Sequence, residues 1–166
     1  MLRLIFLLLV AAPAAAAPPD WAMAVLDDGL AAYRVQDYPR ATRDFRRLAG
    51  EGSAIAETML GVMHARGQGV RRDPATAATW WLRAANRGYP PAQLALAQAY
   101  ASGRGVERDD PAAWVWARLA ATHGDTPTAI RAAALAARLG ATLDAPALAK
   151  LDRRRLAWRP WPTLPD

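Results

Sequence analysis

Few side chains in this chain have the chemistry of a catalytic or metal-binding site. His64 and His123 are its only histidines and it contains no cysteine, so a structural zinc site is not expected. Asp73, Asp109 and Asp110 stand just before predicted helices, where a carboxylate accepts hydrogen bonds from the first free backbone N–H groups. We interpret these three residues as helix caps rather than as acid/base pairs. The sequence therefore predicts no enzyme, no cofactor and no bound metal.

Both histidines have structural explanations. His64 takes the position that Tyr100 fills 36 residues later, so packing between helices is expected of it rather than catalysis. His123 falls in the last turn before Gly124, where a partial positive charge suits the helix dipole.

An internal repeat organises the chain. The stretch from Gly67 to Gly88 returns 36 residues later, from Gly103 to Gly124. The matched pairs include Gly69 with Gly105, Val70 with Val106, Asp73 with Asp109, Ala77 with Ala113, Trp80 with Trp116, and Ala84-Ala85 with Ala120-Ala121. A repeat of this length indicates stacked units, each of which leaves an apolar face for its neighbour to cover.

The tryptophans divide into two groups on this basis. Trp80 and Trp116 are repeat positions and are predicted to lie in the core rather than to form a ligand platform. Trp81 and Trp114 are less constrained by the repeat, which leaves them open to exposure.

Each unit reads as two helices joined by a turn. Glycines at 67 and 69 end the first helix, because only glycine takes left-handed backbone angles without steric cost. Asp73 then caps the second helix and Pro74 opens it. Leu60 and Leu96 fall on the inner stripes and are predicted to be buried. Strand formers are sparse, so we predict an all-α fold, a right-handed α-solenoid of about four helix-turn-helix repeats.

The predicted organisation follows from these units. Residues 1–17 form a signal peptide and residues 18–158 the solenoid. The solenoid comprises an N-terminal pair similar to a tetratricopeptide repeat (22–52), two clear repeats (53–88 and 89–124) and a degenerate C-terminal pair (125–158), followed by a tail rich in Pro and Trp (159–166).

The two central units resemble Sel1-like repeats, relatives of the tetratricopeptide family. The family pattern is carried by Ala56, Leu60, Gly61, Gly67, Gly69, Val70, Asp73, Ala77, Trp80, Ala84, Ala85 and Gly88. His64 departs from it at a Tyr position, and Ala97 replaces the helix glycine in the second copy. The resemblance implies a helical scaffold or adaptor that binds other proteins. Secreted relatives that are linked to β-lactam binding carry disulfides, which this chain lacks.

The resemblance also implies where a partner protein or peptide would bind. In the tetratricopeptide superhelix the first helix of each pair lines the concave groove. By position, the exposed groove residues here are Leu26, Leu30, Tyr33, Arg34, Thr58, Val62, Arg66, Leu94, Gln98, Ser102, Ile130 and Arg138. This set is apolar with arginines near one end, which suits an extended peptide with apolar side chains and an acidic end. The alternative for some of these residues is that they only pack between helices.

Charge and leader sequence bear on the remaining alternatives. The net charge is +6, but the basic residues look scattered, so nucleic acid is not the expected partner. A cell-wall-associated or β-lactam-binding hydrolase is the alternative to a scaffold. Arg3, the apolar run Leu4 to Val10 and the small residues Ala11 to Ala17 are typical of a cleaved secretory signal. We expect cleavage after Ala16, a periplasmic or secreted protein, and no stable membrane insertion afterwards.

Overall fold

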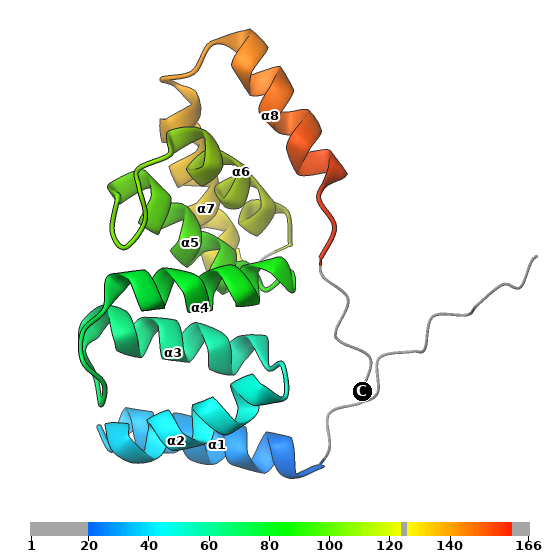
Figure 1. The fold of residues 1–166 in the computed structure, drawn as a ribbon. Helices are drawn as coiled ribbons and strands as arrows, with labels where there is room; N and C mark the ends of the chain where they lie inside the picture. Colours follow the sequence, from blue (N-terminus) through cyan, green and yellow to red (C-terminus); the bar gives the residue numbers. More distant parts are fainter. Residues whose placement is uncertain (1–19, 124–125, 161–166) are drawn as a thin grey trace, which may run out of the picture.

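A computed structural model of the chain describes residues 20–123 and 126–160, which form eight α-helices and no strand within these ranges. The helices are α1 (Asp20–Arg34), α2 (Tyr38–Gly50), α3 (Ala54–Arg66), α4 (Pro74–Asn86), α5 (Pro90–Ser102), α6 (Asp110–His123), α7 (Thr126–Gly140) and α8 (Ala145–Ala157). Figure 1 shows them stacked one above another from α1 and α2 upward. The predicted all-α solenoid is confirmed. The predicted signal peptide lies outside the described residues.

The 36-residue period sets the register of the stack. The first helices of successive units, α3, α5 and α7, begin at residues 54, 90 and 126, which are 36 residues apart. The second helices α4 and α6 begin at Pro74 and Asp110 with the same spacing. The N-terminal pair departs from this spacing because α1 and α2 are joined by the short turn Val35 to Asp37.

The glycine loops join the two helices of a unit and also hold neighbouring units together. Gly67 ends α3 with a φ of 72°, and Gly69 follows with a φ of 68°. A Cβ on Gly69 would lie 2.6 Å from the Cβ of Tyr38, so the loop closes tightly over the start of α2. Gly105 is pressed against the backbone of Pro74 at the start of α4 in the same way. Each loop therefore docks on the second helix of the preceding unit.

The predicted caps are confirmed for Asp73 and Asp109, whereas Asp110 is the first residue of α6 and its carboxylate binds Arg108. The Asp73 carboxylate accepts hydrogen bonds from the backbone N–H groups of Ala75 and Thr76, each at 3.1 Å. The carboxylate of Asp109 accepts one from Ala112 N–H at 2.8 Å. These contacts satisfy N–H groups that the first helical turn leaves free.

The core lies between successive helices. Leu60 and Leu96 are 0% and 1% exposed, which confirms both as core residues. The expectation that Trp114 is open to exposure is wrong: the side chain is 7% exposed, because the alanines of α7 cover it. Trp81 is half-buried.

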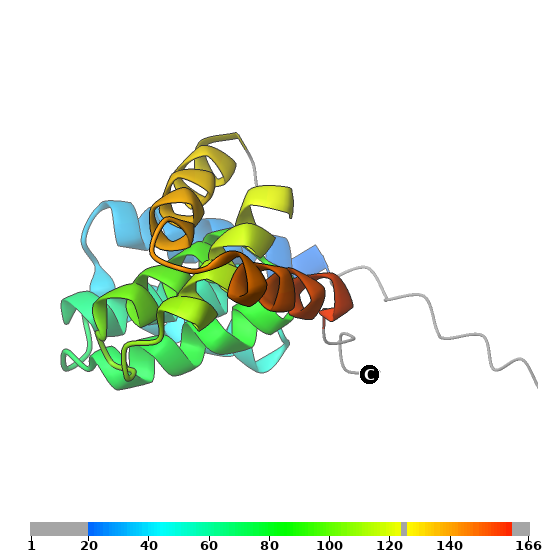
Figure 2. The same cartoon turned by 90° about the horizontal axis from the view of Figure 1, so that it is seen from above.

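The last helix breaks the pattern of the stack. α8 packs mainly against α6 rather than closing on α7, and Figure 2 shows α7 and α8 diverging. The ring of Trp158 meets that of Trp116 edge to face, with centroids 6.1 Å apart. Trp158 and Pro160 then reach Gly88 at the turn between α4 and α5. None of the helices in the described ranges is long and apolar enough to cross a lipid bilayer.

Candidate protein-binding face

The structure exposes most, but not all, of the predicted groove residues. Arg34, Arg66, Gln98, Ser102, Ile130 and Arg138 are exposed, and Leu30, Tyr33 and Val62 are partly exposed. Leu26, Thr58 and Leu94 are buried, so the prediction of their exposure is wrong.

The three buried positions face other helices. Trp81 of α4 donates a hydrogen bond from Nε1 to the carbonyl oxygen of Thr58, at 3.3 Å. Leu94 belongs to the apolar cluster that includes residues of α6, and Leu26 to the cluster that includes Phe45 of α2. Thr58 and Leu94, which are equivalent repeat positions, therefore pack inside the stack and do not line a groove.

The exposed side of the first helices forms a continuous stripe, which we call the first-helix face. It comprises Leu30 and Arg34 of α1, Met59, Val62 and Arg66 of α3, Ala95, Gln98 and Ser102 of α5, and Arg131, Ala134 and Arg138 of α7. Sequence reasoning missed Met59, Ala95, Arg131 and Ala134. Each of them lies 36 residues from another residue of this face, or three to four residues from a predicted groove residue. The repeat period could therefore have identified them.

Arginines stand at both ends of this face. Arg34 and Arg66 lie on α1 and α3, whereas Arg131 and Arg138 lie on α7. The first helix between them, α5, contributes Ala95, Gln98 and Ser102, which carry no charge. The face is thus basic at each end and neutral in the middle, rather than basic at one end as the sequence suggested.

Tyr33 and Arg66 meet in one polar cluster at the α1 end of the face. Arg66 donates from Nη1 to the Tyr33 hydroxyl at 3.4 Å, and that hydroxyl donates to Gln68 Oε1 at 2.8 Å. Gln68 Nε2 in turn donates to the hydroxyl of Tyr38 at 2.9 Å. The rings of Tyr33 and Tyr38 lie edge to face, 5.6 Å apart. The network holds Tyr33 and Arg66 in fixed positions while leaving the arginine exposed.

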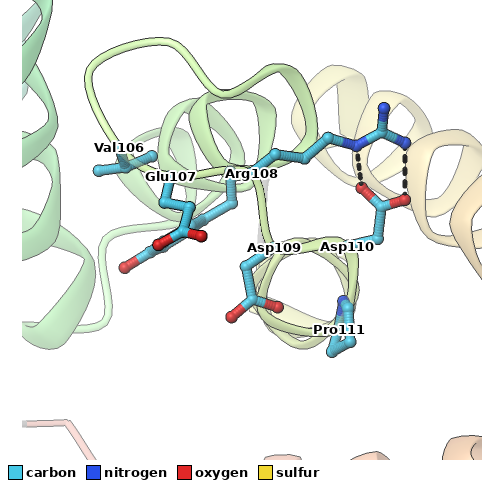
Figure 3. Close-up of a pocket in the computed structure, with 7 residues that line it drawn as sticks. Val106, Glu107, Arg108, Asp109, Asp110 and Pro111 are labelled. Carbon is cyan, nitrogen blue, oxygen red and sulfur yellow. Dashed lines mark hydrogen bonds and ion pairs between the residues drawn. The ribbon is translucent and has the colours of Figure 1, made fainter.

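A surface recess next to the second glycine loop is lined by Tyr100 and by residues 106–111 (Figure 3). Arg108 binds the Asp110 carboxylate through two hydrogen bonds, of 3.0 and 2.8 Å. Hydrogen bonding to Arg108 lowers the pKa of Asp110, so this carboxyl is ionised at neutral pH and is not a general acid. Asp109 is occupied as a helix cap. Two of the three carboxylates that line the recess, those of Asp109 and Asp110, are therefore already engaged, and the third, Glu107, is exposed.

His64 fits its predicted packing role. Its ring is partly buried in α3, and Nδ1 has no hydrogen-bond partner. Burial and the nearby charge of Arg46 lower the pKa of His64, against an opposing effect of Asp73. His123 is the last residue of α6, and its side chain lies outside the described part of the chain. No cluster of three or more metal-binding side chains occurs among the described residues.

Glu57 is a buried charge that the sequence gave no reason to single out. It is 0% exposed in α3, and its carboxylate pairs with Arg83 Nη2 at 2.9 Å and with Arg87 Nε at 3.3 Å. Arg83 belongs to α4, and Arg87 is the residue that follows it. The two arginines follow Glu57 by 26 and 30 residues. The repeat does not mark these positions, because Gln93 and Leu119 replace Glu57 and Arg83 in the next unit.

Comparison with known proteins supports the repeat assignment. A family model described as Sel1 repeat matches residues 54–89 and 90–125. The structure of a protective antigen from uropathogenic Escherichia coli strains, described as displaying an SLR fold, is similar with a TM-score of 0.74 and 28% identity. The match covers 84% of this chain and 30% of that one.

A Sel1 repeat protein from Oxalobacter formigenes is similar in fold, with a TM-score of 0.58 and 22% identity over 75% of this chain and 58% of that one. The chain thus spans less than two thirds of the length of either protein. A search of curated proteins finds no match to the sequence.

Proposed function

We propose that this chain, in which residues 54–125 form two tandem Sel1 repeats, is a protein-interaction scaffold that binds a segment of a partner protein along the first-helix face. Sel1 repeats are typically non-catalytic scaffolds, and stacked repeats present long continuous binding surfaces. The observation that carries the proposal is the first-helix face itself. Its side chains are exposed or partly exposed at equivalent positions of successive helices, and of these Leu30 and Met59 also pack against the core.

The chemistry of this face defines the partner segment. Arg34, Arg66, Arg131 and Arg138 suit acidic residues near both ends of the segment, because guanidinium groups bind carboxylates through paired hydrogen bonds. The neutral middle suits apolar side chains. Tyr33 and Arg66 are expected to anchor the segment, because tyrosine and arginine are enriched among residues that dominate binding energy.

Photo-crosslinking in cells, with identification of the captured protein, provides the partner for a direct test. The double variant Tyr33→Ala/Arg66→Glu is then expected to lose binding to that partner while its melting temperature changes by only about a few degrees. Arg154→Glu on exposed α8 is the control and is expected to retain binding. If the control loses binding while the double variant keeps it, the first-helix face is not the site.

Export to the periplasm or outside the cell is part of the proposed function. The support is the sequence of residues 1–17, with its basic start, apolar run and small residues. Replacing three leucines in the run from Leu4 to Val10 by aspartate is expected to retain the protein in the cytoplasm, as judged by cell fractionation. Unchanged export of this variant would contradict the proposal.

A further inference from the structure

One face of α7 is open where the equivalent faces of α3 and α5 are covered. Ile130 stands 36 residues after Leu94 and 72 after Thr58. Leu94 and Thr58 are 4% and 8% exposed, whereas Ile130 is 64% exposed. Ala133, next on the same side of α7, is also exposed, although its equivalents Gly61 and Ala97 are buried. α7 therefore lacks a covering helix of the kind that α4 and α6 provide for α3 and α5.

The sequence of α8 explains why this helix does not cover α7. In α4, the positions that pack into the stack include Ala77, Trp81 and Ala84; the equivalent positions in α8 are Ala149, Arg153 and Leu156, and all three are exposed. The apolar side chains that α8 buries or partly buries, Leu151 and Leu148, lie on a different side of the helix, and Leu148 lies next to Gly140 at the end of α7. Trp158, just after α8, contacts Trp116 of α6. The buried side of α8 is thus rotated away from the one that would close on α7.

A small recess marks the place where a helix is missing. It encloses about 200 Å³ and is lined by Trp114 and Arg118 of α6, by Ala133, Ala136, Ala137 and Gly140 of α7, and by Leu148 of α8. The guanidinium of Arg118 lies 5.6 Å from the Trp114 ring centroid, so a cation stands beside the apolar floor. Small residues along α7 permit a close approach by another helix.

Charge is concentrated in this part of the chain. Residues 126–160 contain seven basic and two acidic residues, a net charge of +5, whereas residues 20–123 contain thirteen basic and eleven acidic residues. Arg131 and Arg138 are exposed on α7, beside the stripe of Ile130, Ala133 and Ala137. The expectation that the basic residues are scattered is therefore wrong for the C-terminal part.

We propose that the open face of α7 is a docking site for an acidic amphipathic helix of a partner protein, which takes the place that α4 and α6 take over α3 and α5. The side of that helix that packs against α7 is expected to carry small residues. Ala133 carries a methyl group, as its equivalent Ala97 does, whereas its other equivalent, Gly61, leaves space for the large ring of Trp81. The flanks are expected to carry Asp or Glu opposite Arg131, Arg138 and Arg118. The exposed terminal helix of a second copy, α8, does not fit this description, because its exposed side carries Lys150, Arg153 and Arg154.

A designed peptide tests the proposal directly. The probe is a stapled helical peptide that keeps Ala113, Ala117 and Ala120 of α6 at their spacing and carries glutamate at the remaining polar positions. Two matched peptides carry lysine in place of the glutamates, or tryptophan in place of Ala117. Fluorescence anisotropy with the full protein is expected to show binding of the glutamate peptide, weakened by salt, and at least about tenfold weaker binding of both matched peptides.

Variants of the protein then locate the site. Ile130→Glu and Ala133→Arg each change an exposed residue and are expected to weaken the glutamate peptide at least about tenfold. Val35→Glu, at a 76% exposed position between α1 and α2, is expected to leave the affinity unchanged. The variant Tyr33→Ala/Arg66→Glu is also expected to leave it unchanged, which separates this site from the first-helix face. Circular dichroism melts check that each variant is folded.

Three results would overturn the inference. Equal binding of the glutamate and lysine peptides would remove the charge argument. Equal binding by wild type, Ile130→Glu and Ala133→Arg would place the peptide elsewhere. Sedimentation that shows self-association of the protein, abolished by Ile130→Glu, would assign the open face to a second copy instead of an acidic partner helix.

Discussion

The indole of Trp81 fills the space that a side chain at residue 61 would occupy. A Cβ built on Gly61 would overlap the Trp81 ring, whose Nε1 donates to the carbonyl oxygen of Thr58 nearby. The next unit places Ala97 and Ala117 at these two positions, and both are fully buried. A glycine facing a tryptophan has thus been replaced by two alanines, so the two units fill the same interface with different pairs of residues.

Gly61→Ala is therefore expected to be destabilising. The added methyl group overlaps Trp81, and overpacking of this kind lowers the free energy of unfolding by about 1–3 kcal/mol. The double variant Gly61→Ala/Trp81→Ala recreates the Ala97/Ala117 pair and is expected to lose less than the sum of the single variants, as measured by urea unfolding.

Gly50→Ala is the control for this substitution. No atom lies within 4 Å of a Cβ at Gly50, at the end of α2. The change is expected to be neutral or to stabilise by up to about 1 kcal/mol, because alanine reduces the entropy of the unfolded chain. If Gly61→Ala behaves like Gly50→Ala, the tight contact with Trp81 does not constrain this interface.

Removal of the Glu57 carboxylate is expected to be costly. Glu57→Ala leaves Arg87, which is largely buried, without its carboxylate, and breaking a buried ion pair lowers the free energy of unfolding by about 3–5 kcal/mol. Glu51→Ala, at an exposed carboxylate just after α2, is expected to change it by less than about 0.5 kcal/mol. Chemical denaturation of both variants under identical buffer conditions measures the difference.

His64 is expected to make stability depend on pH in mildly acidic solution. Its pKa is lowered in the folded state, so the unfolded chain, with an ordinary histidine pKa of about 6.5, takes up a proton more readily. The free energy of unfolding should therefore fall as the pH drops from about 7 toward the folded pKa. His64→Tyr, which copies Tyr100, should flatten the curve in this window. An unchanged slope would mean that His64 is not its source.

The lowered pKa values of Asp73 and Asp110 make stability depend on pH only in more acidic solution. Their contribution to stability is present above the ordinary aspartate pKa of about 3.9 and is lost only below it. The slope of the pH curve at its acidic end should therefore be the same in wild type and in His64→Tyr, which provides an internal control.

Much of this fold could be predicted because the sequence contains two copies of the 36-residue unit. The glycine loops, the Asp73 and Asp109 caps and the buried Leu60 and Leu96 all follow from a period of 36 residues. The burial of Thr58 and Leu94 could not be predicted by transferring positions from a related superhelix. Those residues face the next helix, and the sequence does not record how far each helix is rotated about its axis.

The C-terminal part was unpredictable for a different reason. The spacing of α8 follows the period, but Leu148, Leu151 and Trp158 move its apolar side away from the repeat position. Where a helix packs is decided by its neighbours as well as by its own pattern. Trp114 likewise becomes buried only because α7 lies over it.

The contact between Trp158 and Trp116 is expected to hold α8 in place. An edge-to-face aromatic pair contributes about 0.5–1.5 kcal/mol beyond the area it buries, and Trp158→Ala removes it. Hydrogen exchange should then become faster in α8 and remain unchanged in α3 and α5. Uniform exchange throughout the chain would show that α8 does not depend on this pair.

The ion pairs of Glu57 help to determine which helices of this repetitive chain pair with one another. The two units share their loop and core positions, so a folding chain can also pair α3 with α6 instead of α4, a shift of one whole unit. In that arrangement Glu57 would be buried next to Leu119 in place of Arg83, and an uncompensated buried carboxylate is strongly unfavourable. Gln93, which is neutral, carries no such demand. Glu57 thus distinguishes one unit from its neighbour and makes the out-of-frame pairing less stable than the native one.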